Sequence, residues 1–283
     1  MPLKVAARLR PERLASWSLV SDQNPVRLVA FDLDDTLAPS KSPVDPRMAD
    51  LLVQLLGVVE VCVISGGQFG QFESQLVDNL PLDNPDALAR LHLMPTCGTQ
   101  YYRYRLDEQG KNGGWQQQYA ENLTETQKSA ALAAVESEAK RLGYWEPDNG
   151  TEVWGPVLED RGSQITFSAL GQAAPVDAKK AWDPTGEKKN ALRAAVQQHL
   201  DDLEVRSGGS TSVDITRRGI DKAYGMSKLS ELTGIPFDQM LFVGDRLDPD
   251  GNDFPVIALG IPTRAVEGWE ETAAVVEQFL AER

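Results

Sequence analysis

The sequence predicts an α/β protein with a Rossmann-like, doubly wound parallel sheet and an inserted α+β domain. Two observations carry this prediction. Short apolar strand-like runs alternate with helical patterns at both ends of the chain, which is typical of βαβ units. Between them, hairpin-like runs and separate helices replace this alternation and indicate a second unit. The chain of 283 residues is long enough for two domains.

The first part of the chain contains three predicted strands and two predicted helices. The strand-like runs are RLVAFDL, VVEVCVIS and RLHLMP. The stretch DPRMADLLVQLLG places its apolar residues at helical spacing and ends at Gly57, and GQFGQFESQLVDNL predicts a second helix. We therefore assign residues 27–102 to the core domain, after an N-terminal extension of residues 1–26.

Residues 103–215 are predicted to form the inserted domain. The run YYRYRLDEQGKNGGWQQQY has two alternating segments around a Gly-rich turn and predicts a hairpin. A helix is predicted over Thr124–Leu142, with a capping box between Thr124 and Gln127. Further strands, a helix near Glu187–Leu200 and a tight hairpin in LEVRSGGSTSVDIT follow. None of these elements forms a parallel crossover, so they indicate a separate α+β unit.

Residues 216–283 return to the strand–helix alternation of the core. The stretch DKAYGMSKLSELTG predicts a helix, MLFVGD a buried strand and FPVIALG another strand. A final helix is predicted over Glu267–Glu282. The core domain is thus expected to consist of residues 27–102 and 216–283.

Composition excludes several classes of function. A formal net charge of −14 argues against a nucleic-acid or anionic-membrane partner. No apolar run approaches the roughly 20 residues that span a bilayer, and the N-terminus lacks the features of a signal peptide. Cys62 and Cys97 are too few for a disulfide framework, so we expect a cytoplasmic protein. His92 and His199 lie outside any zinc-ligand spacing and are expected to be structural.

Acidic side chains follow two of the predicted strands. Asp32 and Asp34 follow the first strand, and Asp245 follows MLFVGD. In open parallel sheets these strand ends meet at the ligand-binding edge, and a period of two places Asp32 and Asp34 on one side. Carboxylates held close together are costly unless a cation lies between them. Oxygen ligands of this kind suit Mg²⁺, so the sequence predicts a magnesium site.

Other residues near these strand ends suit a phosphoryl group. Lys222, at the start of a predicted helix, brings a positive charge, while Ser65, Thr36 and the turn at Gly66 supply hydrogen-bond donors. An aspartate carboxylate can itself attack phosphorus. A D-x-D pair, a lone lysine or a Ser-Gly-Gly turn is common on protein surfaces. Their order and their placement at strand ends make the combination specific for phosphoryl transfer to a small metabolite.

These motifs resemble those of the haloacid dehalogenase superfamily, whose members transfer phosphoryl groups through an aspartate. FDLDDTL resembles the first motif, VISGG the second, Lys222 the third and GDRLDPDGND the acidic fourth. The resemblance implies that Asp32 is the nucleophile and Asp34 the general acid/base. It also implies that Mg²⁺ is held by Asp32, by the backbone carbonyl of Asp34 and by Asp245, with Asn252 and Asp253 around them. The inserted domain then corresponds to a type-two cap.

Within the superfamily the sequence resembles the eukaryotic-type phosphomannomutases. The spacing GD-x6-ND and the segments EDRGSQITFSALGQ and RSGGSTSVDITRRGIDK carry this resemblance. It implies that Arg161, Ser212 and Asp214 bind the sugar phosphate. Gln172 and Lys179 occupy positions at which these mutases have arginines that hold the phosphate that is not reacting. Lys41 lies near the position of a further arginine.

The two replacements led us to expect a phosphatase. A charge-assisted hydrogen bond contributes about 1.5–3 kcal/mol, or roughly 10- to 100-fold in affinity. Gln172 lacks the charge and Lys179 lacks the guanidinium fork, so a sugar bisphosphate should be held less firmly. We therefore predict a Mg²⁺-dependent phosphatase that hydrolyses a phosphorylated sugar or related small metabolite through an aspartyl phosphate.

Two alternatives remain open from the sequence. One is a phosphomannomutase that interconverts mannose 6-phosphate and mannose 1-phosphate, and the other is a non-catalytic module that binds sugar phosphates. The resemblance also allows a homodimer through the cap, because the related mutases dimerise in this way.

Overall fold

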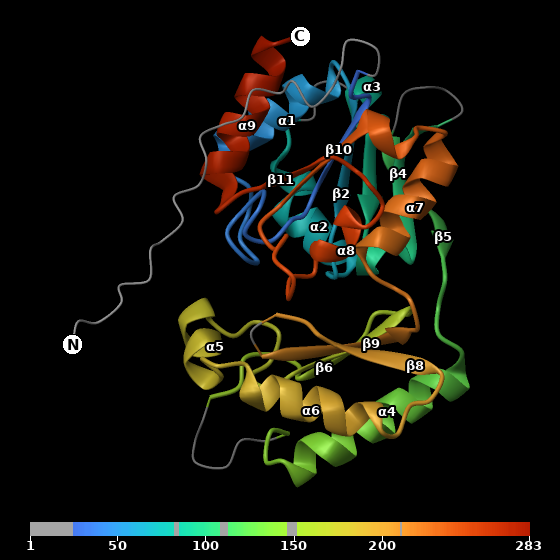
Figure 1. Cartoon of the computed structure of the whole chain (residues 1–283), viewed down its shortest axis with the longest axis vertical. Helices are drawn as coiled ribbons and strands as arrows, with labels where there is room; N and C mark the ends of the chain where they lie inside the picture. The colour runs from blue at the N-terminus through green and yellow to red at the C-terminus, as the bar shows by residue number, and fades with distance from the viewer. Residues whose placement is uncertain (1–24, 82–84, 108–112, 146–151, 210) are drawn as a thin grey trace, which may run out of the picture.

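The computed structural model describes residues 25–81, 85–107, 113–145, 152–209 and 211–283. These residues form two bodies, one above the other in Figure 1, each built around its own sheet. The predicted N-terminal extension, residues 1–26, lies outside the described residues except for Pro25 and Val26. Among the described parts of the chain, no helix is both long and apolar enough to cross a membrane.

The larger body contains a seven-stranded sheet. Its strands, in spatial order, are β11 (Thr263–Ala265), β10 (Met240–Gly244), β1 (Leu28–Phe31), β2 (Glu60–Ile64), β3 (Leu91–Met94), β4 (Gln100–Leu106) and β5 (Gly113–Ala120). The first five are parallel to one another. This parallel sheet, with helices on both faces, confirms the predicted α/β class.

The two faces of this sheet are covered by different helices, because alternate strand residues point to opposite sides. On one face Val29 and Phe31 pack with α1 (Pro46–Leu56), α2 (Phe69–Gln75), α3 (Pro85–Leu88) and α9 (Trp269–Ala281). On the other, Leu28 and Ala30 pack with α7 (Lys222–Thr233) and α8 (Phe254–Ile257). In Figure 1, α9 and α7 accordingly lie on opposite sides of the strands. Single 3₁₀ turns are η1 (Val77–Asn79), η2 (Thr96–Gly98) and η3 (Phe237–Gln239).

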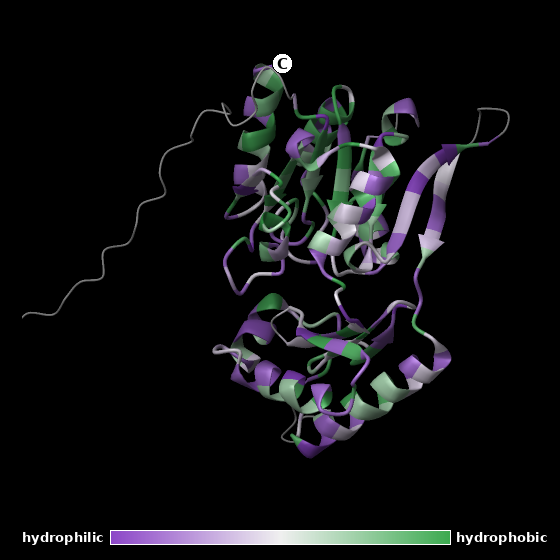
Figure 2. Ribbon diagram, turned by 45° about the vertical axis from the view of Figure 1, so that its right-hand side comes forward, coloured by the Kyte–Doolittle hydropathy of each residue, from purple (hydrophilic) through white to green (hydrophobic). Residues whose placement is uncertain are grey.

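The predicted start of the inserted domain at residue 103 is wrong. The hairpin of β4 and β5 lies at the edge of the large sheet, where β4 pairs antiparallel with β3. Only the short turn η2 separates β3 from β4, which is too short for the crossover that a parallel partner needs. Figure 2 shows this hairpin mostly in purple and white, unlike the green central strands, so its composition resembled that of the inserted domain.

The smaller body, which we call the cap, comprises the described residues of 121–217. Its antiparallel sheet has the order β6 (Leu158–Asp160), β7 (Gln164–Ser168), β9 (Ser212–Arg217) and β8 (Leu203–Ser207). Its helices are α4 (Glu125–Arg141), α5 (Val176–Trp182) and α6 (Glu187–Gln197). The predicted capping box at the start of α4 is confirmed, since Gln127 N donates to Thr124 Oγ1 at 3.2 Å.

The cap sheet has one apolar and one polar face. Ile165, Phe167, Val213 and Ile215 belong to the apolar cluster that α4 and α6 complete. The alternate residues of β7 and β9 are polar; they are Gln164, Thr166, Ser168, Ser212 and Asp214. In Figure 1, α4 and α6 lie on the side of this sheet away from the larger body. The polar face is therefore turned toward the strand ends of the core.

The segment FPVIALG does not form the predicted strand. It begins with the short helix α8, in which Pro255 occupies the first turn. Proline is tolerated at that position, where its missing N–H would have had no partner. Phe254 and Ile257 are exposed, unlike residues of a buried central strand. The edge strand of this part of the sheet is β11, a few residues further along the chain.

Candidate active site

Three neighbouring strands bring the predicted catalytic residues to one edge of the core sheet. Phe31 of β1 pairs with Val243 of β10 and with Val63 of β2. Asp32 and Ser65, which follow β1 and β2, therefore lie next to the end of β10, where Asp245 follows. Segments far apart in the sequence thus meet at the carboxyl ends of parallel strands, where ligands bind in this class of sheet.

A buried lysine joins two of the carboxylates. The Nζ of Lys222 lies 2.6 Å from Oδ1 of Asp32 and also contacts Oδ1 of Asp253. The Lys222 and Asp253 side chains are fully buried. Burial lowers the pKa of Lys222, but the carboxylates of Asp253 and Asp32 outweigh it and hold the pKa above its usual value. Lys222 therefore stays charged as the fixed cation of the site.

Two glycines let the elements that carry these groups approach closely. A Cβ on Gly225, in the first turns of α7, would lie 2.4 Å from Cδ1 of Ile64, so this helix packs directly onto the end of β2. A Cβ on Gly244, at the end of β10, would lie 2.3 Å from Oδ2 of Asp253. Alanine at either position would push Lys222 or Asp253 away from Asp32.

Three carboxylates form a cluster that fits a divalent cation. Oxygens of Asp32, Asp245 and Asp253 lie within 4.8 Å of one another. Burial raises the pKa of Asp32 well above its usual value; the Lys222 ammonium opposes this rise, and the charge of Asp253 adds to it. Three acidic groups against one ammonium leave negative charge that a cation can neutralise, and oxygen ligands suit Mg²⁺.

Some of the residues around this cluster are hydrogen-bonded to its carboxylates and others are not. Asp253 was expected beside the metal; its second oxygen accepts a hydrogen bond from the backbone N of Arg246 at 3.0 Å. The Thr36 hydroxyl donates to Oδ1 of Asp245 at 3.3 Å, and the Asp245 N donates back to it at 3.1 Å. The side chain of Asn252 is exposed, and no contact between the described residues joins it to the cluster. Thr36 thus positions Asp245.

The Asp34 carboxylate points to a different set of groups. Its Oδ1 accepts from the backbone N of Lys41 at 2.7 Å and from Nε2 of Gln75 at 3.3 Å, and its Oδ2 accepts from Nε2 of Gln71 at 2.8 Å. Sequence reasoning missed both glutamines. A signal was present, because they are four residues apart on a helix that follows Ser65 directly, and this spacing places both amides on one helix face.

The second motif is where the core touches the cap. Ser65 Oγ accepts from the backbone N of Gly67 at 3.2 Å. The carbonyl of Gly66 accepts from Nη1 of Arg161 at 2.9 Å and from Nε2 of Gln164 at 3.3 Å, so two cap side chains are anchored on this turn. The predicted hydrogen-bond donors of this turn are its amides, and its carbonyl, an acceptor, binds the cap.

Three cationic side chains meet around Gln172, and one of them, Arg161, is paired with the Glu159 carboxylate, whose Oε2 lies 2.7 Å from its Nη2. Lys41 Nζ, from the core, donates to the carbonyl of Gln172 at 2.8 Å and to its Oε1 at 3.1 Å. Lys179 Nζ donates to the same carbonyl at 3.2 Å, and Nη2 of Arg161 lies 3.4 Å from the Gln172 side-chain oxygen. Nε2 of Gln172 is buried and has no hydrogen-bond partner among the described residues.

This cationic cluster lines a cavity of about 520 Å³ between core and cap. Gln71 and Gln75, whose amides donate to Asp34, line the same cavity, whereas Asp32 and Asp34 themselves are not among its lining residues. Ser212 and Asp214 are not among its lining residues. Ser212 Oγ donates to Ser168 Oγ at 3.1 Å, and Thr166 Oγ1 donates to Asp214 Oδ1 at 2.7 Å, so both engage their own sheet. Burial raises the pKa of Asp214, and Arg161 opposes that rise.

The chain is similar in sequence to known phosphomannomutases. Residues 152–282, which include most of the cap and all of the third and fourth motifs, match the family model "Eukaryotic phosphomannomutase". A probable phosphomannomutase of Caenorhabditis elegans is 25% identical over 268 residues, covering 90% of this chain and 96% of that protein. Phosphomannomutase 1 of Homo sapiens is 24% identical over 240 residues, covering 82% and 83%.

Solved structures share the fold. The IMP-nucleotidase of Plasmodium falciparum, in a C-terminally truncated form, has a TM-score of 0.66 at 15% identity, covering 94% of this chain and 74% of that one. A haloacid dehalogenase-like hydrolase of Bacteroides thetaiotaomicron has a TM-score of 0.57 at 14% identity, covering 90% and 99%. The chain therefore shares the fold of these proteins, and its sequence is similar to those of eukaryotic phosphomannomutases. Both predicted resemblances are thereby confirmed.

The two groups of residues described above have separate places. The carboxylates and Lys222 lie at the strand ends of the core. The cations around Gln172 line the cavity, mostly on the cap. The site can therefore attract negative charge at two points, one of them beside Asp32.

Proposed function

We propose that this protein is a Mg²⁺-dependent phosphohexomutase that moves a phosphoryl group between two positions of a hexose phosphate, with mannose phosphates as its first candidate substrates. The observation that carries the proposal is the cluster of Lys41, Arg161 and Lys179 around Gln172. It offers a second anion site in the cavity that Gln71 and Gln75, the partners of Asp34, also line, and a bisphosphorylated sugar needs such a site. The names of the related sequences support the same activity.

The reaction begins with a substrate phosphate beside Asp32. An Asp32 oxygen attacks phosphorus, the bond from phosphorus to the sugar oxygen breaks, and Asp34 gives that oxygen a proton. In the return step Asp34 takes a proton from a sugar hydroxyl, whose oxygen attacks the phosphorus and frees Asp32. Gln71 and Gln75 position the Asp34 carboxylate for both proton transfers.

Charge at the reacting phosphate is offset from two sides. Lys222 supplies a fixed ammonium at 2.6 Å from the nucleophile. Asp32 and Asp245 would hold Mg²⁺, which when bound neutralises phosphoryl oxygens. Ser65 supplies a hydroxyl at the same edge. These groups act on whichever phosphate of the sugar is turned toward the core, while the cationic cluster holds the other.

A phosphatase is the second candidate, and Gln172 favours it. Arginine at this position would add a guanidinium fork, whereas the Gln172 amide adds no charge and leaves Nε2 without a partner among the described residues. A bisphosphate held less firmly leaves before it turns around, and water then has time to attack the aspartyl phosphate. The core motifs can transfer the phosphoryl group from Asp32 to water or to a sugar hydroxyl equally well.

The two activities are separated by following the fate of phosphorus. Mannose 1-phosphate is incubated with Mg²⁺ and a catalytic amount of glucose 1,6-bisphosphate, and ³¹P NMR follows the products. We expect mannose 6-phosphate to accumulate with little free phosphate. Free phosphate formed at the rate of substrate loss would establish the phosphatase instead. Failure of the full chain to turn over any hexose phosphate would leave only a binding function.

The affinity for the second phosphate should depend on pH through Lys179. Burial, and then the nearby charge of Lys41, lower the pKa of Lys179 to about 8. Its ammonium is charged below that pH and loses its proton above it, so kcat/KM should fall as the pH rises through about 8. The variant K179R, which stays charged, should weaken this fall. K180R on the exposed neighbouring lysine is the matched control, and a K179R profile identical to that of the wild type would contradict the role.

A further inference from the structure

A second cavity lies at the opposite edge of the core sheet, away from the cap. Its volume is about 480 Å³. Arg27 and Arg90 directly precede β1 and β3, and Glu60 is the first residue of β2, so the cavity lies at the amino ends of the strands that carry the active site at their carboxyl ends. The lengths of β1 and β2 separate the two places.

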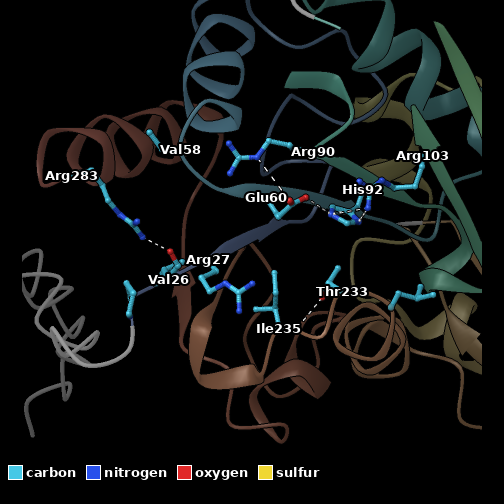
Figure 3. A pocket seen from close by; sticks show the side chains of 12 residues that line it. Val26, Arg27, Val58, Glu60, Arg90, His92, Arg103, Thr233, Ile235 and Arg283 are labelled. Carbon is cyan, nitrogen blue, oxygen red and sulfur yellow. Dashed lines mark hydrogen bonds and ion pairs between the residues drawn. The ribbon is translucent and has the colours of Figure 1, made fainter. Parts of the chain in front are cut away.

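The charges that line this cavity are strongly unequal. Among the described residues, four arginines line the cavity, Arg27, Arg90, Arg103 and Arg283, and Glu60 supplies the one side-chain carboxylate. Figure 3 shows Arg27, Arg90 and Arg283 around the hollow, each extending from a different part of the chain. Such a concentration of positive charge is unexpected in a chain whose net charge is −14.

The contacts of these arginines leave most of that charge uncompensated. Arg27 Nη1 donates to the amide oxygen of Gln239 at 3.2 Å, Arg283 Nη2 donates to the backbone carbonyl of Val26, and Arg103 Nη2 to that of Ala89. These acceptors are neutral. Nε of Arg103 is buried without a hydrogen-bond partner among the described residues.

The one acidic group is already engaged. Glu60 Oε2 lies 2.9 Å from Nε2 of the buried His92, while its Oε1 is 3.9 Å from Nε of Arg90. Burial lowers the pKa of His92, so the ring donates a hydrogen bond to Glu60 as a neutral group at pH 7. The carboxylate therefore offsets at most one guanidinium, and the hollow between Arg27, Arg90 and Arg283 stays cationic.

The rim of the cavity is apolar. Val58 and Leu232 line it and are 43% and 50% exposed, values that are unusual for large aliphatic side chains. Ile235 also lines the cavity. A ligand that matches this lining carries a doubly charged head for the guanidinium forks and an apolar part for the rim. Arginine forks match the oxygens of a phosphoryl group in a bidentate way.

We propose that this cavity is a second ligand site, separate from the active site, that binds a small organophosphate: its phosphoryl group between Arg27, Arg90 and Arg283, its organic part against Val58, which lies on the same side of the cavity as Arg283. The site is independent of the proposed mutase or phosphatase chemistry, since none of its residues belongs to the machinery at Asp32 or Gln172. A ligand bound here would contact the starts of β1 and β2, whose ends carry the nucleophile and Ser65.

The probe for a test is phenylphosphonate, which has a dianionic head and an apolar ring and is not a phosphate ester. Its binding to the full chain is measured by isothermal titration calorimetry at low salt with EDTA. We expect the wild type to bind it more tightly than inorganic phosphate, which lacks the ring. The double variant R27Q/R90Q should bind it at least about tenfold more weakly, because two charge-assisted contacts are lost.

Two further variants assign the result to one of the two cavities. R47Q/R193Q removes two exposed arginines elsewhere and should bind as the wild type does. R161Q alters the anion site beneath the cap, so it should weaken only the binding that R27Q/R90Q retains and leave the binding that R27Q/R90Q loses. Equal affinities of the wild type and R27Q/R90Q, no binding to the wild type, or a loss of binding confined to R161Q would each overturn the proposal. Retained turnover in R27Q/R90Q would show that the active site is intact.

Discussion

Replacing Asp32 with asparagine is expected to lower kcat by at least about 10³-fold, the order of loss seen when a catalytic nucleophile is removed. The amide of D32N is a poor nucleophile and cannot take up the phosphoryl group. Asp32 is only 4% exposed, with Lys222 at 2.6 Å, so a change of nearly equal volume should leave the local packing in place. The measurement is steady-state turnover of mannose 1-phosphate, for isomerised sugar and for free phosphate together.

The neighbouring acid provides a matched control for D32N. Asp35 is exposed, has a left-handed backbone with φ of 58°, and accepts a hydrogen bond from the backbone N of Ser40 at 3.1 Å. Asparagine tolerates that conformation and keeps the acceptor oxygen, so D35N should retain activity close to that of the wild type. A D32N enzyme as active as D35N would show that Asp32 is not the nucleophile.

Replacing Lys222 with methionine should destabilise the fold by about 3–5 kcal/mol, the range for breaking a buried ion pair. The stem of the side chain is retained, but the buried carboxylates of Asp32 and Asp253 lose their shared counter-charge. The free energy of unfolding of K222M and the wild type is measured by urea denaturation with EDTA. Added Mg²⁺ should recover part of the loss in K222M, because a cation beside Asp32 and Asp245 relieves the same repulsion.

Lys228, on the same helix, separates this effect from a general change in α7. Its Nζ lies 3.3 Å from Glu121 Oε1, and the side chain is 35% exposed. Partly exposed ion pairs of this kind contribute little, so K228M should cost about 1 kcal/mol or less. A loss in K222M no larger than that in K228M would mean that the buried lysine does not hold the carboxylates together.

The strand ends of the core could be predicted from sequence because their signals are local. An apolar run followed by Asp32, or by Ser65 and two glycines, specifies both the strand and the residue at its end. The α/β fold class was predicted from the alternation of such strands with helices along the chain. Prediction failed at two places where the local signal was ambiguous. The polar hairpin of β4 and β5 resembles the cap in composition but pairs with the core sheet. The segment FPVIALG is apolar enough for a strand, but a helix begins there with Pro255 in its first turn.

The contacts between core and cap could not be predicted. Lys41 and Gln172 are 131 residues apart, and only the position of the cap over the core sheet brings the Lys41 ammonium to the Gln172 carbonyl. From sequence, Gln172 indicated a weakened phosphate grip and therefore a phosphatase. With Lys41, Arg161 and Lys179 gathered around it, the loss of one positive charge at Gln172 is partly offset, and this shifts our proposal toward the mutase.

The central claim is that Asp32 carries the phosphoryl group of a sugar bisphosphate during turnover. The protein is mixed with Mg²⁺ and glucose 1,6-bisphosphate, quenched in acid and reduced with borohydride, which converts an acyl phosphate to an alcohol, and the modified residue is located by mass spectrometry. The account predicts reduction at Asp32 in the wild type and none in D32N. Reduction at another residue, or none anywhere while the enzyme turns over, would contradict it.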